Sequence, residues 1–304
     1  MTADAHYLVL DVGGSGIKYA TATAGGTLGE RSVLPTSYTT HEEFIDAVVG
    51  IIDGHADSAG PALAGVAFST CGEVDPESGH MLSGGLLTFN AGENYITSLR
   101  ERCDLRVTVE NDANCALLAE MRDGALADVD TGVVMVLGSA VGGAVMLDRR
   151  VLHGARFHAG NLSALITDLA RPDEHMYTSM GAAFLVEAYR QRRGDEPDIA
   201  DGRDFFERLS SGSPAAAASL QAYAARLSAL IFNLQVVLDV EAFAVGGGIS
   251  AQDALIDAVA AEVERRFDAV PLDLPRPAIA ACRYRNDANL LGALWHHLTA
   301  SAAS

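Results

Sequence analysis

The chain lacks the features that would place it outside the cytoplasm. Its four cysteines are scattered, and no two have the spacing of a metal or redox pair; they are Cys71, Cys103, Cys115 and Cys282. The N-terminal segment has no basic stretch and no apolar run long enough for a signal peptide. No stretch approaches the length of a membrane span. We therefore expect a cytoplasmic protein with reduced thiols.

Basic charge is also scarce. The 304 residues include 40 acidic and 21 basic side chains, which gives a formal net charge of −19. Such an acidic surface repels phosphate backbones, so we expect neither nucleic acid nor anionic membrane as a partner. Apolar residues make up 49% of the chain. That share is enough for a buried core and excludes wholesale disorder.

Lysine is almost absent. Twenty of the 21 basic residues are arginine, and the single lysine, Lys18, lies in the most glycine-rich loop near the N-terminus. A compact ammonium group fits where a wide guanidinium would not, so Lys18 is a candidate functional residue. In a chain so rich in arginine, chance is the alternative explanation of its position.

Short apolar strands alternate with helical periodicity, which indicates α/β layers. Residues 7–11 and 17–23 predict two strands around a glycine turn, and 28–34 predicts a third strand. The strand, glycine turn, strand pattern returns at 133–147, which suggests a duplicated α/β unit with its boundary near 111–131. The second half predicts helices at 179–192, 203–210, 214–239 and 251–267.

The first candidate site runs from Asp11 to Lys18. A strand that ends in a carboxylate leads into a glycine turn, whose exposed backbone N–H groups can bind an anion. Ser15 can donate to a phosphoryl oxygen, and Asp11 can hold Mg²⁺ through water. An ordinary β-hairpin turn is the alternative. The motif is neither a Walker loop nor a Rossmann fingerprint, because a strand rather than a helix is predicted to follow.

Two further glycine turns follow predicted strands in the second half. The turn from Gly138 to Gly143 is the counterpart of the first loop, and such a pair could hold a triphosphate from both sides. Simple inheritance of a duplicated fold is the alternative. The run from Gly246 to Gly248 would let an adenine or ribose approach the backbone, although a tight strand-to-helix turn would also need these glycines.

Polar residues crowd a predicted strand-to-helix junction at Glu110-Asn111-Asp112-Ala113-Asn114. Asn111 or Asp112 can cap the helix. A capping carboxylate is ionised and rigid, so Asp112 can also accept a hydroxyl proton during phosphoryl transfer. Because phosphate loops are predicted on both sides of it in the sequence, we favour the base role for Asp112.

Together these motifs resemble the ROK family of sugar kinases and repressors. The resemblance covers nearly the whole chain and rests on DVGGSGIK (11–18), ENDANCALLAE (110–120), LGSAVGGAVMLDRRVLHGARFHAG (137–160), FAVGGGIS (243–250) and YRNDANLLGALWHHL (284–298). It implies the duplicated actin-like, hexokinase-like (ribonuclease H-like) α/β ATPase fold. The N-terminal domain would span 1–112 and the C-terminal domain 113–287, with a final helix at about 288–304 packing back on the first. A homodimer is also implied.

The resemblance implies site residues as well. Asp112 would be the catalytic base, and ATP and Mg²⁺ would be the cofactors. Gly13, Gly14 and Ser15 would bind phosphate near Mg²⁺, Gly138 and Ser139 would lie at the β- and γ-phosphates, and Gly246, Gly247 and Gly248 near the nucleoside. We expect Asp11 and Lys18, candidates from the residues themselves, at the same cofactor site. Asn111, Gly72 and Gly85 would lie on the sugar side, where we also expect Asn94 and Asn161 as substrate-binding residues.

The chain departs from the family pattern at two motifs. In the second glycine loop, Ser139, Ala140 and Ala144 replace a threonine and two glycines. The usual Ala-Gly-Glu segment ends here in Asn161, and the histidine that follows it in the family is absent. No cysteine occurs between 116 and 281, so we expect no zinc site. The chain is therefore most similar to the zinc-free subgroup that includes β-glucoside kinases.

We expect an ATP-dependent sugar kinase whose two lobes close over a primary hydroxyl, the 6-OH of a hexose or hexoside. A non-catalytic sugar-sensing or interaction protein is the alternative, because the sugar motif is eroded. The repressor function is not expected, since repressors carry a helical DNA-binding domain before the first phosphate loop, which here starts at Asp11.

Overall fold

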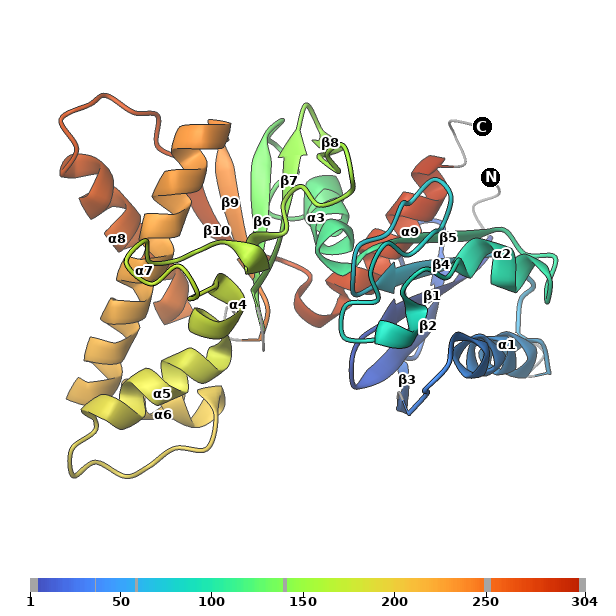
Figure 1. Cartoon of the computed structure of the whole chain (residues 1–304), viewed down its shortest axis with the longest axis horizontal. Coiled ribbons are helices and arrows are strands. Elements are labelled where there is room, and N and C mark those ends of the chain that lie inside the picture. The colour runs from blue at the N-terminus through green and yellow to red at the C-terminus, as the bar shows by residue number, and fades with distance from the viewer. Residues whose placement is uncertain (1–4, 36, 58–59, 139–140, 249–252, 301–304) are drawn as a thin grey trace. The chain divides into compact units, whose positions relative to one another are not determined.

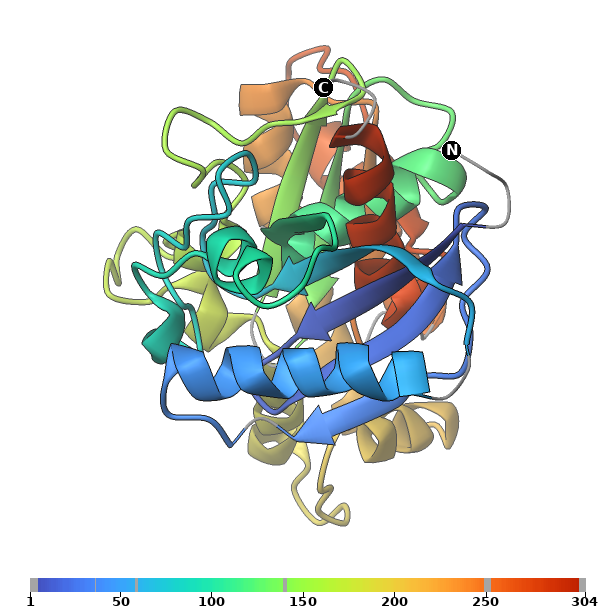
Figure 2. The ribbon, with the colours of Figure 1, turned by 90° about the vertical axis from the view of Figure 1, so that its right-hand side faces the viewer.

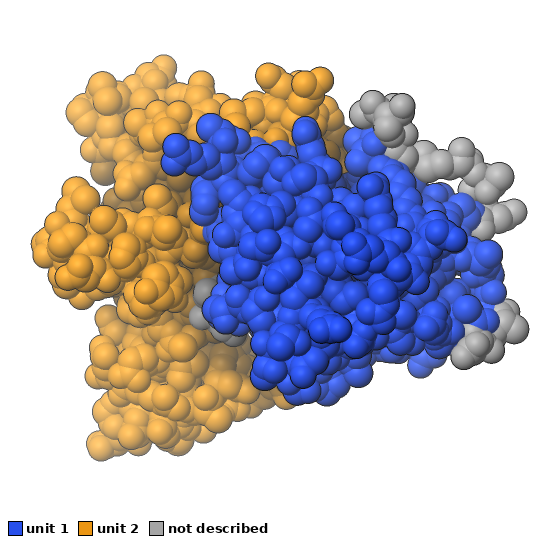
Figure 3. Space-filling view, turned by 45° about the vertical axis from the view of Figure 1, so that its right-hand side comes forward, with its two compact units in different colours: residues 1–119, 153–159, 287–304 blue, residues 120–152, 160–286 orange. Residues whose placement is uncertain are grey.

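The computed structural model describes residues 5–35, 37–57, 60–138, 141–248 and 253–300 (Figure 1). They form two compact units, each built around one five-stranded sheet. Unit 1 comprises residues 1–119, 153–159 and 287–304, and unit 2 comprises residues 120–152 and 160–286 (Figure 3). We predicted a boundary at 112/113, whereas this division falls inside α3 (Asp112–Asp123) and assigns a short later segment, 153–159, to unit 1.

The sheet of unit 1 has the strand order β3-β2-β1-β4-β5. Its strands are β1 (His6–Val12), β2 (Gly16–Thr23), β3 (Ser32–Pro35), β4 (Leu63–Thr70) and β5 (Val107–Asn111). The first three strands are antiparallel neighbours, while β1, β4 and β5 run parallel. The third strand is shorter than the predicted 28–34, because Leu28 makes only an isolated bridge to Ala22.

Helices cover both faces of this sheet (Figure 2). Successive side chains of a strand point to opposite faces, so Leu8 and Leu10 pack in one core with Phe44 of α1 (His41–Asp57). Tyr7 points the other way and contacts the His297 ring of α9 (Ala288–Ala300) with centroids 5.3 Å apart. Burial on both faces explains why β1 is apolar without alternation. A short helix, α2 (Tyr95–Arg100), follows the 3-10 turn η1 (Thr88–Asn90).

Unit 2 repeats this topology. Its strands are β6 (Gly132–Leu137), β7 (Val141–Leu147), β8 (Arg150–Val151), β9 (Ala242–Gly246) and β10 (Ala278–Ala281), in the order β10-β9-β6-β7-β8. The strands β6, β7 and β8 are antiparallel neighbours, and β6, β9 and β10 are parallel. Read from β8, the order matches that of unit 1 strand for strand, as the predicted duplication requires.

The helices of unit 2 are α4 (Met176–Ser179), α5 (Ala182–Arg192), α6 (Gly202–Ser210), α7 (Pro214–Leu238) and α8 (Asp253–Asp268); η2 (Leu162–Ala164) and η3 (Arg285–Asp287) are 3-10 turns. We predicted one helix at 179–192, but it begins only after Gly181, which has extended backbone angles. The start of α7 is set by Ser213, whose hydroxyl accepts a hydrogen bond from Ala216 N, followed by a proline in the first turn.

One helix corrects an expectation from the sequence. By length and composition alone, α7 is apolar enough to cross a membrane, although we expected no such stretch. Half of its most apolar window is buried inside the protein, and residues such as Tyr223, Leu227 and Ile231 belong to the core of unit 2. An alanine-rich helix packed in a core passes the same test as a membrane span.

Packing explains why the start of α3 belongs to unit 1. Gly292 of α9 lies directly against the backbone of Cys115: a Cβ at this glycine would be 1.8 Å from the Cys115 carbonyl oxygen. Only glycine permits this approach, so α9 and the first turns of α3 pack backbone to backbone.

Candidate functional site

The carboxyl ends of three parallel strands meet at one edge of the unit 1 sheet. Val12 at the end of β1 is paired with Thr70 at the end of β4, which is paired with Asn111 at the end of β5. Ligands of open α/β sheets commonly bind beyond this edge. The loops that follow the three strands contain most of the residues of unit 1 that we predicted from the sequence.

The first loop is a tight link between β1 and β2. Gly13 N donates to Gly16 O at 3.0 Å, and Gly14 and Ser15 are exposed. A Cβ at Gly14 would lie 2.8 Å from the Leu86 side chain, so a larger residue would displace that leucine. The loop therefore has an accessible backbone, and the binding of an anion by this backbone stays a prediction.

Asp11 lies beneath this loop and is held by three side chains. Asn289 Nδ2 and Ser69 Oγ donate to its Oδ1 at 2.9 and 3.2 Å, and Lys18 Nζ lies 3.5 Å from its Oδ2. Lys18 thus pairs with a carboxylate of the predicted site. Asn289 was not predicted, although it lies in a motif that carried the family resemblance.

Asp11 and its surroundings suit a hydrated divalent cation better than a closed metal site. The described residues contain no group of three or more His, Cys, Asp or Glu side chains that could hold a metal. Mg²⁺ characteristically keeps several waters and takes one or two carboxylates plus substrate phosphates. The Asp11 carboxylate beside an exposed glycine loop fits that pattern.

Asp112 is the first residue of α3. Its Oδ1 accepts hydrogen bonds from Ala113 N at 2.8 Å and from Asn111 Nδ2 at 3.0 Å. Burial and, second to it, the nearby Asp11 charge together raise the pKa of the Asp112 carboxyl from 3.8 to about 6 in spite of these hydrogen bonds. A carboxyl group with this pKa can both accept and return a proton near neutral pH.

Asn111 caps the helix and anchors the second loop. Its Oδ1 accepts from the backbone of Ala113 and Asn114 at 2.9 and 3.2 Å, while its Nδ2 donates to Gly72 O at 3.0 Å. Gly72 in turn packs against Gly85, since a Cβ at either glycine would lie 2.8 Å from the backbone nitrogen of the other. Both have positive φ, of 91° and 54°. The structure therefore brings Asn111, Gly72 and Gly85 together beside Asp112.

The other two predicted sugar residues have local contacts. Asn94 is the N-cap of α2: its Oδ1 accepts from Thr97 N, and its Nδ2 donates to Ser78 O, both at 2.9 Å. Neither partner lies at the ends of β1, β4 or β5. Asn161 is exposed in unit 2, where it accepts a hydrogen bond from Ser163 Oγ.

A buried carboxylate two residues before Asp112 was missed from the sequence. Glu110 has only 1% of its side chain exposed. Its Oε1 accepts from Asn111 N and Asn114 Nδ2 at 2.8 and 2.9 Å, and its Oε2 is 2.8 Å from His153 Nε2 and 3.8 Å from His296 Nδ1. The sequence offered no signal for this cluster, because its histidines are distant along the chain.

These partners set the pKa of Glu110. Burial alone would raise the pKa of Glu110, but the His153 hydrogen bond and the charges of both histidines lower it. The Glu110 hydrogen bond raises the pKa of His153. Glu110 and His153 therefore form an ion pair that fixes the segment 153–159 onto the β5–α3 junction of unit 1.

In unit 2, two of the predicted nucleotide loops lie side by side. Gly138 directly follows β6; Ser139 and Ala140 lie outside the described residues. Gly247 follows β9 with a φ of 94°, and a Cβ there would be 2.3 Å from Leu137 O. Gly247 is thus required by close contact with the end of β6. Gly246 packs against Cys282, whereas a Cβ at Gly248 would meet no described atom within 4 Å.

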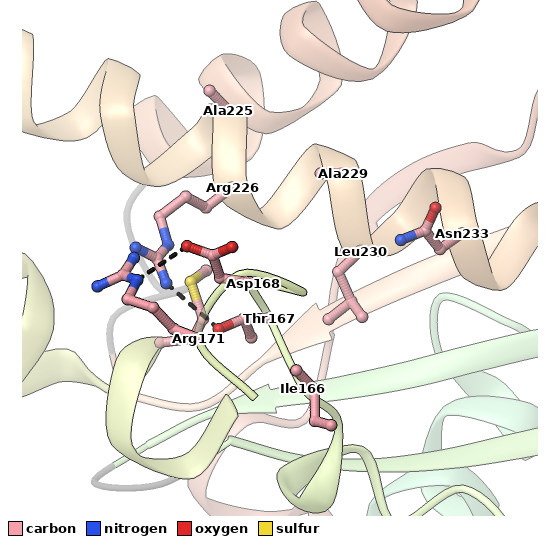
Figure 4. A pocket seen from close by; sticks show the side chains of 10 residues that line it. Ile166, Thr167, Asp168, Arg171, Ala225, Arg226, Ala229, Leu230 and Asn233 are labelled. Carbon is pink, nitrogen blue, oxygen red and sulfur yellow. Dashed lines mark hydrogen bonds and ion pairs between the residues drawn. The ribbon is translucent and has the colours of Figure 1, made fainter. Parts of the chain in front are cut away.

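A cavity of about 330 Å³ also lies in unit 2, between α7 and the segment before α4 (Figure 4). Its lining includes Thr167, Asp168, Arg171, Arg226 and Leu230. Arg171 is paired with Asp168 at 2.8 Å, and Arg226 Nη2 is 3.4 Å from Thr167 Oγ1. No predicted site residue lines this cavity, and its charged groups are held in ion pairs, Asp168 with Arg171 and Arg226 with Glu174, so it adds nothing to the candidate site.

We compared the sequence and the structure of the chain with those of known proteins. The model of the ROK family matches residues 7–299. A β-glucoside kinase from Klebsiella pneumoniae is 28% identical, over 94% of this chain and 94% of that protein. A ROK family protein from Streptococcus pneumoniae TIGR4, solved in complex with sucrose, has a TM-score of 0.85 and 25% identity, covering 98% of this chain and 100% of that one.

A further solved structure is a ROK family glucokinase from Streptomyces griseus in complex with glucose and AMPPNP. Its TM-score is 0.79 at 23% identity, over 95% of this chain and 98% of that one. These similarities confirm the predicted duplicated actin-like, hexokinase-like fold.

Proposed function

The chain belongs to the ROK family, and we propose that it is an ATP-dependent sugar kinase that phosphorylates the 6-hydroxyl of a hexose or hexoside. ATP and Mg²⁺ are the cofactors of this activity. The observation that carries the proposal is the position and pKa of Asp112. A proton acceptor with a pKa of about 6 stands beside an exposed glycine loop and a second carboxylate, at the edge of the sheet where ligands bind.

Asp112 is the general base in this proposal. Its Oδ1 is held by Ala113 N and Asn111 Nδ2, which leaves Oδ2 for the sugar. Oδ2 takes the proton of the attacking hydroxyl, the hydroxyl oxygen bonds to the γ-phosphorus, and the bond from that phosphorus to the bridging oxygen breaks to release ADP. Asp11 would hold Mg²⁺ there, and the ion would neutralise phosphate charge.

The glycine turns bind the phosphates and the nucleoside. Gly13, Gly14 and Ser15 donate to phosphoryl oxygens, and Lys18 fixes the Asp11 carboxylate. In unit 2, Gly138 and Ser139 take the β- and γ-phosphates, and the open backbone at Gly248 takes the nucleoside. Backbone donors of this kind need no reorganisation during transfer, which is why such loops stabilise developing charge.

The sugar is the less constrained part of the proposal. Asn111, Gly72 and Gly85 form the sugar side of unit 1, and Asn161 takes part from unit 2. The Klebsiella relative makes a β-glucoside one candidate substrate. Asn161 gives a neutral hydrogen bond where a glutamate would give a charge-assisted one. That replacement is the observation that favours the second candidate function, a sugar sensor that binds without phosphorylation.

The proposal includes a homodimer acting in the cytoplasm. Size-exclusion chromatography with light scattering measures the first point directly, because a dimer has twice the 31.8 kDa mass of the chain. A monomer at micromolar concentration would remove this part of the proposal and leave the kinase activity untouched.

Product analysis tests the activity. The protein is incubated with Mg-ATP and D-glucose, N-acetyl-D-mannosamine or methyl β-D-glucoside, and products are identified by mass spectrometry and ³¹P NMR. We expect a sugar 6-phosphate and an equal amount of ADP, and no product from 6-deoxy-D-glucose. Sugar binding without any phosphorylated product would support the sensor function instead.

A further inference from the structure

We propose that Asn289 is a positioning residue: its side chain fixes the Asp11 carboxylate in the orientation in which that carboxylate would hold hydrated Mg²⁺. This inference rests on the proposed function. Asn289 is the second residue of α9, whereas Asp11 lies near the end of β1. Both belong to unit 1, so the contact lies within one compact part of the chain.

Two side chains from different elements hold the same oxygen of Asp11. Asn289 Nδ2 donates to Oδ1 at 2.9 Å, and Ser69 Oγ, which belongs to β4, donates to it at 3.2 Å. Ser69 is fully buried, and the Asp11 side chain is only 16% exposed. The terminal torsion of an aspartate side chain is broad when nothing holds it, so the two donors together select one orientation of the carboxylate.

Both donors to Oδ1 are neutral, so they orient the carboxylate without cancelling its charge. Lys18 Nζ lies 3.5 Å from the other oxygen, Oδ2, which is longer than the about 2.7–2.9 Å of a charge-assisted hydrogen bond. Mg²⁺ demands near-ideal ligand geometry and is bound through one or two carboxylates. A carboxylate that keeps its charge and has a fixed direction meets both requirements.

The carboxylate that Asn289 holds lies close to the proposed base. After burial, the charge of Asp11 is the next cause that raises the pKa of the Asp112 carboxyl. The exposed glycine loop begins two residues after Asp11, at Gly13. The orientation of Asp11 therefore bears on the place where the proposed reaction transfers the phosphoryl group.

Other contacts dock α9 on unit 1 without Asn289. Gly292 lies directly against the backbone of Cys115, and His297 Nδ1 lies 2.9 Å from Thr108 Oγ1 of β5. Alanine is also the best helix former. We therefore expect Asn289→Ala to keep α9 in place and to lose only the orientation of the carboxylate.

A purely structural role is the alternative explanation, in which Asn289 only attaches the start of α9 to β1. The two roles predict different measurements. A lost attachment changes the melting midpoint and changes nucleotide affinity equally with and without Mg²⁺. A lost orientation of Asp11 changes only the part of the nucleotide affinity that depends on Mg²⁺.

The test compares Asn289→Ala with wild type and with Thr299→Ala. The control also removes a side-chain hydrogen bond from α9, but at about 15 Å along the helix from Asn289. Binding of AMPPNP to the full chain is measured by calorimetry in Mg²⁺ and in EDTA, so the readout does not need turnover. The ratio of the two dissociation constants measures how far Mg²⁺ strengthens binding.

We expect Asn289→Ala to lower this ratio by about fivefold. The effect is smaller than the loss of a whole hydrogen bond to a charged group, because Ser69 still holds the same oxygen. The affinity in EDTA stays at its wild-type value, and the melting midpoint falls no further than in Thr299→Ala. The control itself keeps the ratio within about twofold of wild type.

A second variant, Ser69→Ala, keeps the test decisive if Asn289→Ala does not fold. It removes the other donor to Oδ1 without touching α9, and we expect the ratio to fall by about threefold, because its hydrogen bond is the longer one. An unchanged ratio in either folded variant would overturn the inference, as would a wild type whose AMPPNP binding Mg²⁺ does not strengthen. A wild type that shows the ratio but phosphorylates no sugar would overturn the proposed kinase, while the ratios would still decide the role of Asn289.

Discussion

Glu110 and Asp112 lie two residues apart where β5 meets α3, and their pKa values are shifted in opposite directions. Burial opposes ionisation of both. For Asp112 the second influence is another carboxylate, Asp11, and the pKa rises to about 6. For Glu110 it is the pair of histidines, His153 and His296, and the pKa falls.

Both carboxyl groups are buried, so the difference between their pKa values comes from their partners. The partners therefore determine whether the carboxyl group can act as a base or stays ionised in a structural ion pair. Asp112 has a proton-accepting oxygen and a raised pKa, which suit catalysis. Glu110 stays ionised and holds Asn111 N, Asn114 and His153 in place. Four substitutions, given in order of decreasing expected effect, test this difference between the two carboxyl groups.

The largest effect is expected for Asp112→Asn. Loss of the base lowers kcat by about 10²–10⁴-fold. The variant should be at least as stable as wild type at pH 7.5: the native fold favours the neutral carboxyl, so ionisation between pH 3.8 and about 6 costs stability that asparagine does not lose. Steady-state kinetics and thermal melting check both parts, with the exposed Asp104→Asn as control. A wild-type kcat in the Asp112→Asn protein would show that Asp112 is not the general base.

Glu110→Gln should have the reverse profile. It removes the carboxylate that pairs with the half-buried His153, and breaking a pair that has one fully buried partner costs about 3 kcal/mol. For domains of this size the melting midpoint of unit 1 should fall by about 6–12 °C. Turnover at 20 °C should fall less than in Asp112→Asn, because the base is retained. If Glu110→Gln melts like wild type and loses kcat as completely as Asp112→Asn, the two residues do not differ as proposed.

The Glu110–His153 pair also predicts a pH dependence of stability. The pKa of His153 is raised above its ordinary 6.5, so the stability that the pair contributes is complete below pH 6.5 and is lost as pH rises through the raised value. The pKa of Glu110 is lowered from 4.5, so the same contribution is lost again in acid as pH falls through the lowered value. Melting midpoints from pH 5 to 9 should decline on the alkaline side in wild type, and this decline should be smaller in His153→Gln. Parallel curves for the two proteins would show that the pair does not titrate.

The smallest effect is expected for Asn114→Ala. This change removes one of the hydrogen-bond donors of Glu110 but leaves both histidines in place. Loss of one such bond costs about 1 kcal/mol, which lowers the melting midpoint by about 2–4 °C. Differential scanning fluorimetry detects that shift, and kcat should stay within about twofold of wild type. A larger loss than in Glu110→Gln would mean that Asn114, rather than the ion pair, anchors the junction.

Local chemistry explains which parts could be predicted. Three features each depend on a few consecutive residues and could be predicted: the glycine turn after Asp11, the polar junction at Asp112 and the repeated strand pattern. The periodicity of 214–239 likewise located α7, which is Pro214–Leu238. By contrast, Gly181 interrupted the helix predicted at 179–192, because helical periodicity does not reveal the backbone angles of a single glycine.

Long-range partners account for what could not be predicted. Asn289 reaches Asp11 across 278 residues, and His153 reaches Glu110 across 43. A polar side chain can also cap a helix or hold a turn, and the sequence alone does not distinguish such a structural role from ligand binding. Asn94 was predicted on the sugar side, and its two hydrogen bonds cap α2 and hold Ser78. These two hydrogen bonds do not support a contact between Asn94 and a sugar, which stays a prediction.

The most direct test of the central claim is the initial rate of ADP release from Mg-ATP, measured with and without each sugar for wild type and Asp112→Asn side by side. The account predicts that at least one sugar stimulates ADP release by the wild type and that Asp112→Asn loses this stimulation by about 100-fold or more. ADP release that no sugar stimulates, or equal stimulation in the two proteins, would contradict it.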